Sequence, residues 1–98
     1  MNKQDYLLTC LAEECGEVTQ RVTKALRFGI DEVQKGQELT NAERLTNELT
    51  DIATLIEMLR EECGLWLPVY TTSKILAKKE RVKEYMKLSI EQGRLEND

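Results

Sequence analysis

The sequence predicts an all-α fold, with three main helices forming a bundle in a single domain over residues 1–98. Apolar residues recur at helical spacing in three segments. One proline, five glycines and an aromatic content of 5% are too few turn and strand markers for an all-β domain. A chain of 98 residues with 41% apolar content is large enough to bury one core.

The first helix is predicted over residues 5–28. Lys24 and Arg27 fall in its last turn and Gly29 follows, which is typical of a helix C-terminus. Its apolar stripe consists of Leu7, Leu11, Val18, Val22 and Ala25.

The second helix is predicted after a loop over residues 30–39 that has room for one short helical turn. Thr40 and Glu43 have the spacing of a capping box, so the helix should begin there, and Gly64 should end it. Its apolar stripe, the strongest core signal in the chain, consists of Leu45, Leu49, Ile52, Leu55, Ile56 and Leu59.

The third helix is predicted over residues 74–92, with Ser73 as its cap. Ile75, Val82, Met86 and Ile90 form its stripe. Residues 65–72, which contain the only proline, should form an extended connector packed against the bundle. Its aromatic residues, Trp66 and Tyr70, fit plugging of the bundle end better than stacking on a base.

Composition excludes several function classes. Eighteen acidic and fourteen basic residues give a net charge of −4, and no long basic run predicts nucleic-acid binding. Without histidine, Ser-His-Asp and Cys-His catalysis and histidine-ligated zinc are excluded. The three cysteines lack metal-binding spacing and should be free thiols, which favours a cytoplasmic protein. No apolar run is long enough to span a membrane.

Two helices carry carboxylates inside their apolar stripes. At about 100° per residue, Glu14 projects within about 20° of Leu7, and Glu48 within about 20° of Leu59. Glu17 and Asp51 follow at the stripe edges. The remaining acids of these helices should face solvent; they are Glu13, Glu43, Glu57, Glu61 and Glu62.

Four converging carboxylates need a positive partner, because their repulsion and lost hydration would cost several kcal/mol each. Oxygen-only ligands suit Mg²⁺, with Mn²⁺ as a substitute. Without these four, fourteen acidic residues balance the fourteen basic ones. The alternative is that Glu14 and Glu48 form ordinary salt bridges with Arg21, Lys24 or Arg44.

The same carboxylates resemble known motifs. Residues 13–17 (EECGE) and 48–51 (ELTD) are similar to the E-E-x-x-E and E-x-x-D motifs of the MazG-like all-α nucleoside triphosphate pyrophosphohydrolases. The resemblance implies a bundle completed by dimerisation, hydrolysis of a nucleoside triphosphate to monophosphate and pyrophosphate, and Mg²⁺ ligation by Glu14, Glu17, Glu48 and Asp51. The spacer between the motifs, residues 18–47, is longer than usual in that family.

Residues 74–81 (KILAKKER) resemble the basic third segment of that family. We expect phosphate contacts from Lys74, Lys78, Lys79 and Arg81, although lysines on a helix often only solubilise it. The wide stripe of the second helix, with further apolar surface near Met58, favours a homodimer or homotetramer. Two alternatives to a general nucleotide pyrophosphohydrolase stay open: a narrower relative acting on dUTP, dCTP or phosphoribosyl-ATP, and a non-catalytic helical interaction module.

Overall fold

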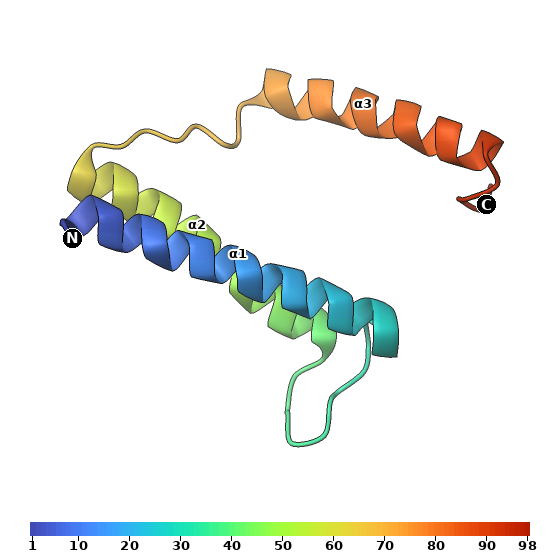
Figure 1. Cartoon of the computed structure of the whole chain (residues 1–98), viewed down its shortest axis with the longest axis horizontal. Coiled ribbons are helices and arrows are strands. Elements are labelled where there is room, and N and C mark those ends of the chain that lie inside the picture. The colour runs from blue at the N-terminus through green and yellow to red at the C-terminus, as the bar shows by residue number, and fades with distance from the viewer. The chain divides into compact units, whose positions relative to one another are not determined.

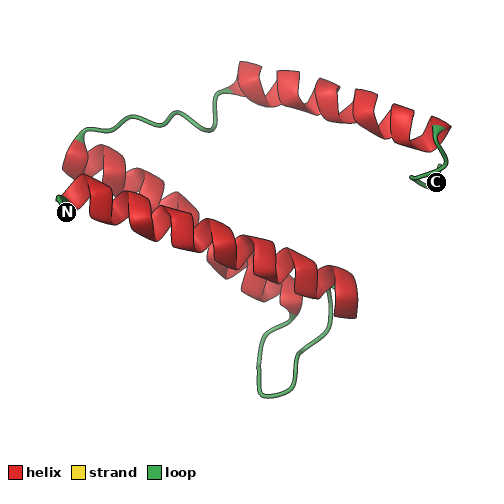
Figure 2. Cartoon of the chain, viewed as in Figure 1, coloured by secondary structure: helices red, strands yellow, loops and turns green.

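The computed structural model describes residues 1–98 and is all-helical. Three helices follow in order, α1 (Lys3–Phe28), α2 (Asn41–Cys63) and α3 (Thr72–Glu91), and there is no strand (Figure 1, Figure 2). The predicted all-α class and the number of helices are therefore confirmed, whereas the packing of the three helices into a bundle stays a prediction. The chain divides into two compact units, Met1–Leu67 and Pro68–Asp98, which are described separately.

Helices α1 and α2 lie side by side and run in opposite directions, forming a hairpin (Figure 1). Its core is small: Leu7 is 5% exposed and Leu59 is fully buried. Other stripe residues are half-buried; they are Leu11, Val18, Ala25, Leu45, Ile52, Leu55 and Ile56. Val22 and Leu49 are exposed, so the predicted stripes were too wide, because two helices bury only the strips that face each other.

The ends of α1 are set by local hydrogen bonds. The Asn2 side chain accepts from the Asp5 backbone N–H at 2.7 Å, so the helix begins at Lys3, two residues earlier than predicted. At the other end, Gly29 adopts a φ of 107° and donates its N–H to the Ala25 carbonyl at 2.9 Å. A side chain at Gly29 would be strained, which explains why glycine ends this helix.

Residues 30–39 form a loop, as predicted, but it contains no helical turn. The loop is fastened to the start of α2. The backbone N–H groups of Asn41 and Ala42 donate to the carbonyls of Glu32 and Ile30 at 2.9 and 3.0 Å. The buried Asn41 side chain also donates to the Gly29 carbonyl at 2.8 Å. Donors that a helix N-terminus leaves free are thus used to hold the loop.

The predicted capping box of α2 is confirmed. The Thr40 hydroxyl accepts from the Glu43 N–H at 3.1 Å, and the Thr40 N–H donates to the Glu43 carboxylate at 3.0 Å. Gly64 ends the helix in the left-handed conformation with a φ of 66°, donating to the Arg60 carbonyl at 3.1 Å.

Helix α3 agrees with the predicted range to within two residues, but its predicted cap is wrong. The helix is preceded by Thr71, and Ser73 lies inside its first turn. The Thr71 hydroxyl donates to the Pro68 carbonyl at 3.2 Å, so no side chain caps α3. No residue of α3 is buried.

In the connector over residues 65–71, the two aromatic side chains are more exposed than predicted. Leu65 and Leu67 are half-buried, whereas Trp66 is 64% exposed and Tyr70 is 76% exposed. The Trp66 ring therefore does not plug the end of the α1/α2 hairpin. Trp66 instead has the Arg60 guanidinium 5.7 Å from its ring centre.

None of the three helices combines the length and the apolar character that crossing a bilayer would require.

Candidate metal centre

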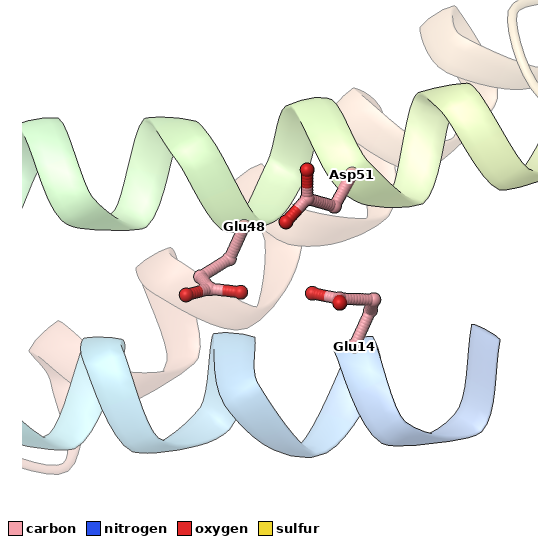
Figure 3. A group of neighbouring side chains, drawn as sticks. All are labelled: Glu14, Glu48 and Asp51. Atoms are coloured by element: carbon pink, nitrogen blue, oxygen red, sulfur yellow. The ribbon is translucent and has the colours of Figure 1, made fainter. Parts of the chain in front are cut away.

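The carboxylates that interrupt the apolar stripes meet between α1 and α2. Glu14 extends from α1 toward α2, and Glu48 and Asp51 extend from α2 toward α1 (Figure 3). Residues three apart on a helix project about one turn from each other, so Glu48 and Asp51 lie on neighbouring parts of one face. The antiparallel hairpin brings that face against the middle of α1.

The three carboxylates are close enough to share one cation. Glu14, Glu48 and Asp51 each offer one oxygen atom, and these atoms all lie within 4.8 Å of one another. Glu14 and Glu48 are half-buried and Asp51 is exposed, so the cluster opens to solvent on one side. Carboxylate oxygens in this arrangement are ligands that a hard divalent cation prefers.

Glu14 has a raised pKa and one oxygen atom without a hydrogen-bond partner. Its Oε2 atom is covered from solvent and has no hydrogen-bond partner. A hydrogen bond with the Glu48 carboxyl, desolvation, and the negative charges of Asp51, Glu48 and Glu17 raise its pKa from 4.5 to about 7. At neutral pH Glu14 is therefore close to the midpoint of its titration, and a nearby cation would favour its charged form.

The salt-bridge alternative for Glu14 and Glu48 is not found. The ion pairs of the structure join Arg60 to Glu57 at 3.9 Å and to Glu61 at 3.7 Å, and Lys83 to Glu80 at 3.6 Å. None includes a cluster carboxylate. The negative charges of the cluster consequently lack a basic partner within the unit Met1–Leu67.

Glu17 lies outside the group of three. It is exposed on α1, three residues beyond Glu14, and a rotation of about 300° carries its side chain to the edge of the face. Its charge still acts on Glu14. Its role as a fourth ligand stays a prediction. The acids expected to face solvent do so; Glu13, Glu43, Glu57, Glu61 and Glu62 are all exposed.

The basic candidates lie on α3, in the second unit. Lys74, Lys78 and Lys79 line one groove along this helix, whereas Arg81 is not part of its lining. All four side chains are exposed. Their predicted contact with phosphate stays a prediction.

Arg21 is a residue that sequence reasoning considered only as a salt-bridge partner. It is half-buried, and its Nε atom is covered from solvent without a hydrogen-bond partner. It follows Glu14 by seven residues, which places it on nearly the same face of α1, about 10 Å along the helix axis. The spacing of seven residues between Glu14 and Arg21 could have predicted that Arg21 shares the face of Glu14.

Comparisons with known proteins assign no family to the chain. No model of a known protein family, no curated protein and no solved structure matches it. The function is therefore inferred from the geometry and chemistry of the carboxylate cluster and from its sequence motifs.

Proposed function

We propose that this protein is a Mg²⁺-dependent nucleotide pyrophosphohydrolase of the MazG-like type. Its substrate is a nucleoside or deoxynucleoside triphosphate, and its products are the monophosphate and pyrophosphate. One observation carries the proposal: Glu14, Glu48 and Asp51 converge from two helices, with one oxygen of each within 4.8 Å of the others. Their positions coincide with the two sequence motifs that resemble that family.

The cluster suits a bound divalent ion on chemical grounds. Its donors are carboxylate oxygens alone, which favours Mg²⁺ or Mn²⁺ over softer metals. The covered Oε2 atom of Glu14 lacks a partner, and a cation would satisfy it. Glu14, Glu48 and Asp51 would hold the ion, with Glu17 as the proposed fourth ligand.

The reaction replaces a phosphoanhydride bond by a bond to a water oxygen. Bound Mg²⁺ neutralises phosphate oxygens and lowers the pKa of water. A cluster carboxylate with a free oxygen orients the attacking water and accepts its proton. The bridging oxygen stays with the product whose phosphorus is not attacked, so the reaction consumes one water and needs no other reactant.

Lysines would supply the remaining positive charge. A triphosphate carries more negative charge than one divalent ion neutralises, and basic side chains commonly complete such sites. We assign this role to Lys74, Lys78 and Lys79, with Arg81 as a further candidate. We also propose a homodimer or homotetramer as the assembled form.

The experiment is pyrophosphate release from a panel of nucleotides, measured with Mg²⁺ and with EDTA. The panel contains the eight common ribo- and deoxynucleoside triphosphates, dUTP and phosphoribosyl-ATP. We expect release that requires the metal. Restriction to dUTP, dCTP or phosphoribosyl-ATP would identify a narrower relative. No release from any member would contradict the proposal and favour a helical interaction module.

A further inference from the structure

Two arginines interrupt the apolar face along which α1 and α2 pack. Arg21 lies between Val18 and Ala25 in the stripe of α1, and all three residues are half-buried. On α2, Arg44 is half-buried beside the stripe residue Leu45. A guanidinium in such a position loses part of its hydration, so it is stable there only with a partner of opposite charge.

Most hydrogen-bond donors of the two arginines are unused. A guanidinium has five N–H donors. One N–H of Arg21 donates to the Gln20 side chain at 3.4 Å, which is long for a hydrogen bond, and the covered Nε atom has no partner. One N–H of Arg44 donates to the Gln34 side chain at 2.9 Å. Both acceptors are neutral amides, and no carboxylate of the unit Met1–Leu67 forms an ion pair with either arginine.

Both arginines lie on the same side of the carboxylate cluster. Arg21 follows Glu14 by seven residues and Arg44 precedes Glu48 by four, which are displacements of about 10 Å and about 6 Å along the helix axes. Because α1 and α2 run in opposite directions, both displacements point toward the loop over residues 30–39 (Figure 1). Both positions stay within about 40° of the cluster face. The face that carries the carboxylates therefore continues into a pair of cations.

This order of charges is complementary to a metal-bound phosphate chain. A cation held by the carboxylates would bind phosphate oxygens at one end of the chain. A polyphosphate carries anionic oxygens along its whole length, so it can also contact guanidinium groups further along, whereas a lone carboxylate has one anionic group. The planar guanidinium binds phosphate oxygens through paired N–H donors, which makes arginine well suited to such a contact.

We propose that Arg21 and Arg44 form a phosphate subsite beside the carboxylate cluster. They bind the part of the triphosphate chain that extends from the metal toward the loop. The inference rests on the proposed function and adds two substrate-binding residues from the same unit as the cluster. Arginine stays protonated, so both residues bind and orient the phosphates and take no part in proton transfer. Gln34 is a positioning residue for Arg44, which gives the long spacer between the motifs a role.

The test is binding of inorganic tripolyphosphate to the full chain in Mg²⁺, measured by isothermal titration calorimetry. Tripolyphosphate has the phosphate chain without base or sugar, so the measurement isolates phosphate recognition. Arg21→Met and Arg44→Met keep a long apolar side chain and remove the charge, and each should weaken binding at least about tenfold. Arg27→Met is the matched control, because it makes the same change at an exposed position of α1, and it should bind like wild type.

Thermal melts without tripolyphosphate distinguish a phosphate subsite from a structural role. Arg21→Met should melt at the wild-type temperature or above it, because the variant keeps the apolar stem and removes a half-buried charge that lacks a partner. An arginine that stabilises the hairpin through an ion pair would instead give a lower melting temperature with unchanged tripolyphosphate binding. Arg21→Lys keeps the charge but lacks the planar fork, so it should recover part of the binding lost in Arg21→Met.

Three binding results would overturn the proposal. They are no binding of tripolyphosphate by wild type, unchanged binding in both Arg21→Met and Arg44→Met, and equal weakening by Arg27→Met. Tripolyphosphate binding that depends on both arginines, without pyrophosphate release from any nucleotide, would contradict the proposed hydrolysis and support the subsite. Pyrophosphate release with unchanged KM in both arginine variants would support the hydrolase and overturn the subsite.

Discussion

The Glu14 carboxyl on α1 faces the Glu48 carboxyl on α2, and an oxygen of each lies within 4.8 Å of the other (Figure 3). Two carboxylates at this separation repel each other when both are ionised. A shared proton relieves the repulsion, which is why the pKa of Glu14 rises to about 7. A metal ion would relieve it in the same way while displacing the proton.

The stability of the metal-free protein should fall as pH rises toward neutrality. Folded Glu14 binds its proton more tightly than the unfolded chain does, so its contribution favours folding below pH 4.5 and is lost as pH rises to about 7. Urea unfolding in EDTA across this range measures the effect. Glu14→Gln should flatten the pH dependence and Glu62→Gln should not. Equal slopes in wild type and Glu14→Gln would show that Glu14 is not the source of the pH dependence.

Glu48→Gln should lower hydrolysis by a factor of about 10² or more while leaving the helices intact. The substitution is nearly isosteric but removes the negative charge of one proposed metal ligand. Steady-state kinetics with saturating Mg²⁺ tests it. Glu62→Gln, an exposed change on the same helix, is the control. Full activity of Glu48→Gln would mean that the site is misassigned.

Lys78→Ala and Lys79→Ala should each reduce kcat/KM by about tenfold or more, since each would remove a proposed charged contact to phosphate. Lys87→Ala serves as the control, because Lys87 projects about 120° from Ile75 and does not line the groove. Dimerisation should be measured in parallel, so that lost assembly is not mistaken for lost substrate binding. If neither variant changes kcat/KM, the lysines have no role in phosphate binding.

Asn41→Ala should destabilise the hairpin by about 1–3 kcal/mol. Asn41 is fully buried, and its side-chain nitrogen donates to the Gly29 carbonyl at 2.8 Å and to the Glu32 carboxylate at 3.3 Å. Truncation leaves the Gly29 carbonyl without this donor. Urea denaturation measures the loss, with Asn47→Ala as the exposed control. Equal stability of the two variants would show that Asn41 does not anchor the loop.

The helices were predictable from sequence because their signals are local. The Thr40–Glu43 box and the glycines at positions 29 and 64 act within a few residues, and all three lie where predicted. The cap of α3 was not predictable, because the Thr71 hydroxyl bonds to Pro68 instead of to the helix. The hydrogen bond from Asn41 to the Gly29 carbonyl was not predictable, because it joins residues twelve apart and depends on the path of the loop between them.

Part of the candidate site was predictable, because the direction of a side chain on a helix follows from its position in the sequence. Helical angles placed Glu14 and Glu48 on inward faces, and the hairpin brings them together with Asp51. Angles alone do not determine the separation of two helices or their relative shift along the axis. Glu17, predicted at the edge of the same stripe, consequently stays outside the group of three. The covering of the Arg21 Nε atom likewise depends on how the helices pack, which helical angles do not determine.

Binding of Mg²⁺ should raise the thermal stability of the protein, and neutralising the cluster should remove that gain. On the proposed function the ion would bind only the folded cluster, because an unfolded chain disperses Glu14, Glu17, Glu48 and Asp51. The stabilisation follows RT ln(1 + [L]/Kd), which is about 2.7 kcal/mol at a hundredfold excess over Kd.

The measurement is a pair of thermal melts, in Mg²⁺ and in EDTA, at neutral pH and constant ionic strength. We expect wild type to melt several degrees higher with the metal. The double variant Glu14→Gln/Glu48→Gln should melt at nearly the same temperature in both buffers, and above wild type in EDTA, because it lacks the carboxylate repulsion. The double variant Glu57→Gln/Glu62→Gln makes the same change in charge outside the cluster and should respond to Mg²⁺ like wild type. Identical wild-type melting temperatures in millimolar Mg²⁺ and in EDTA would mean that the carboxylates do not bind the metal, and the interaction-module alternative would then be favoured.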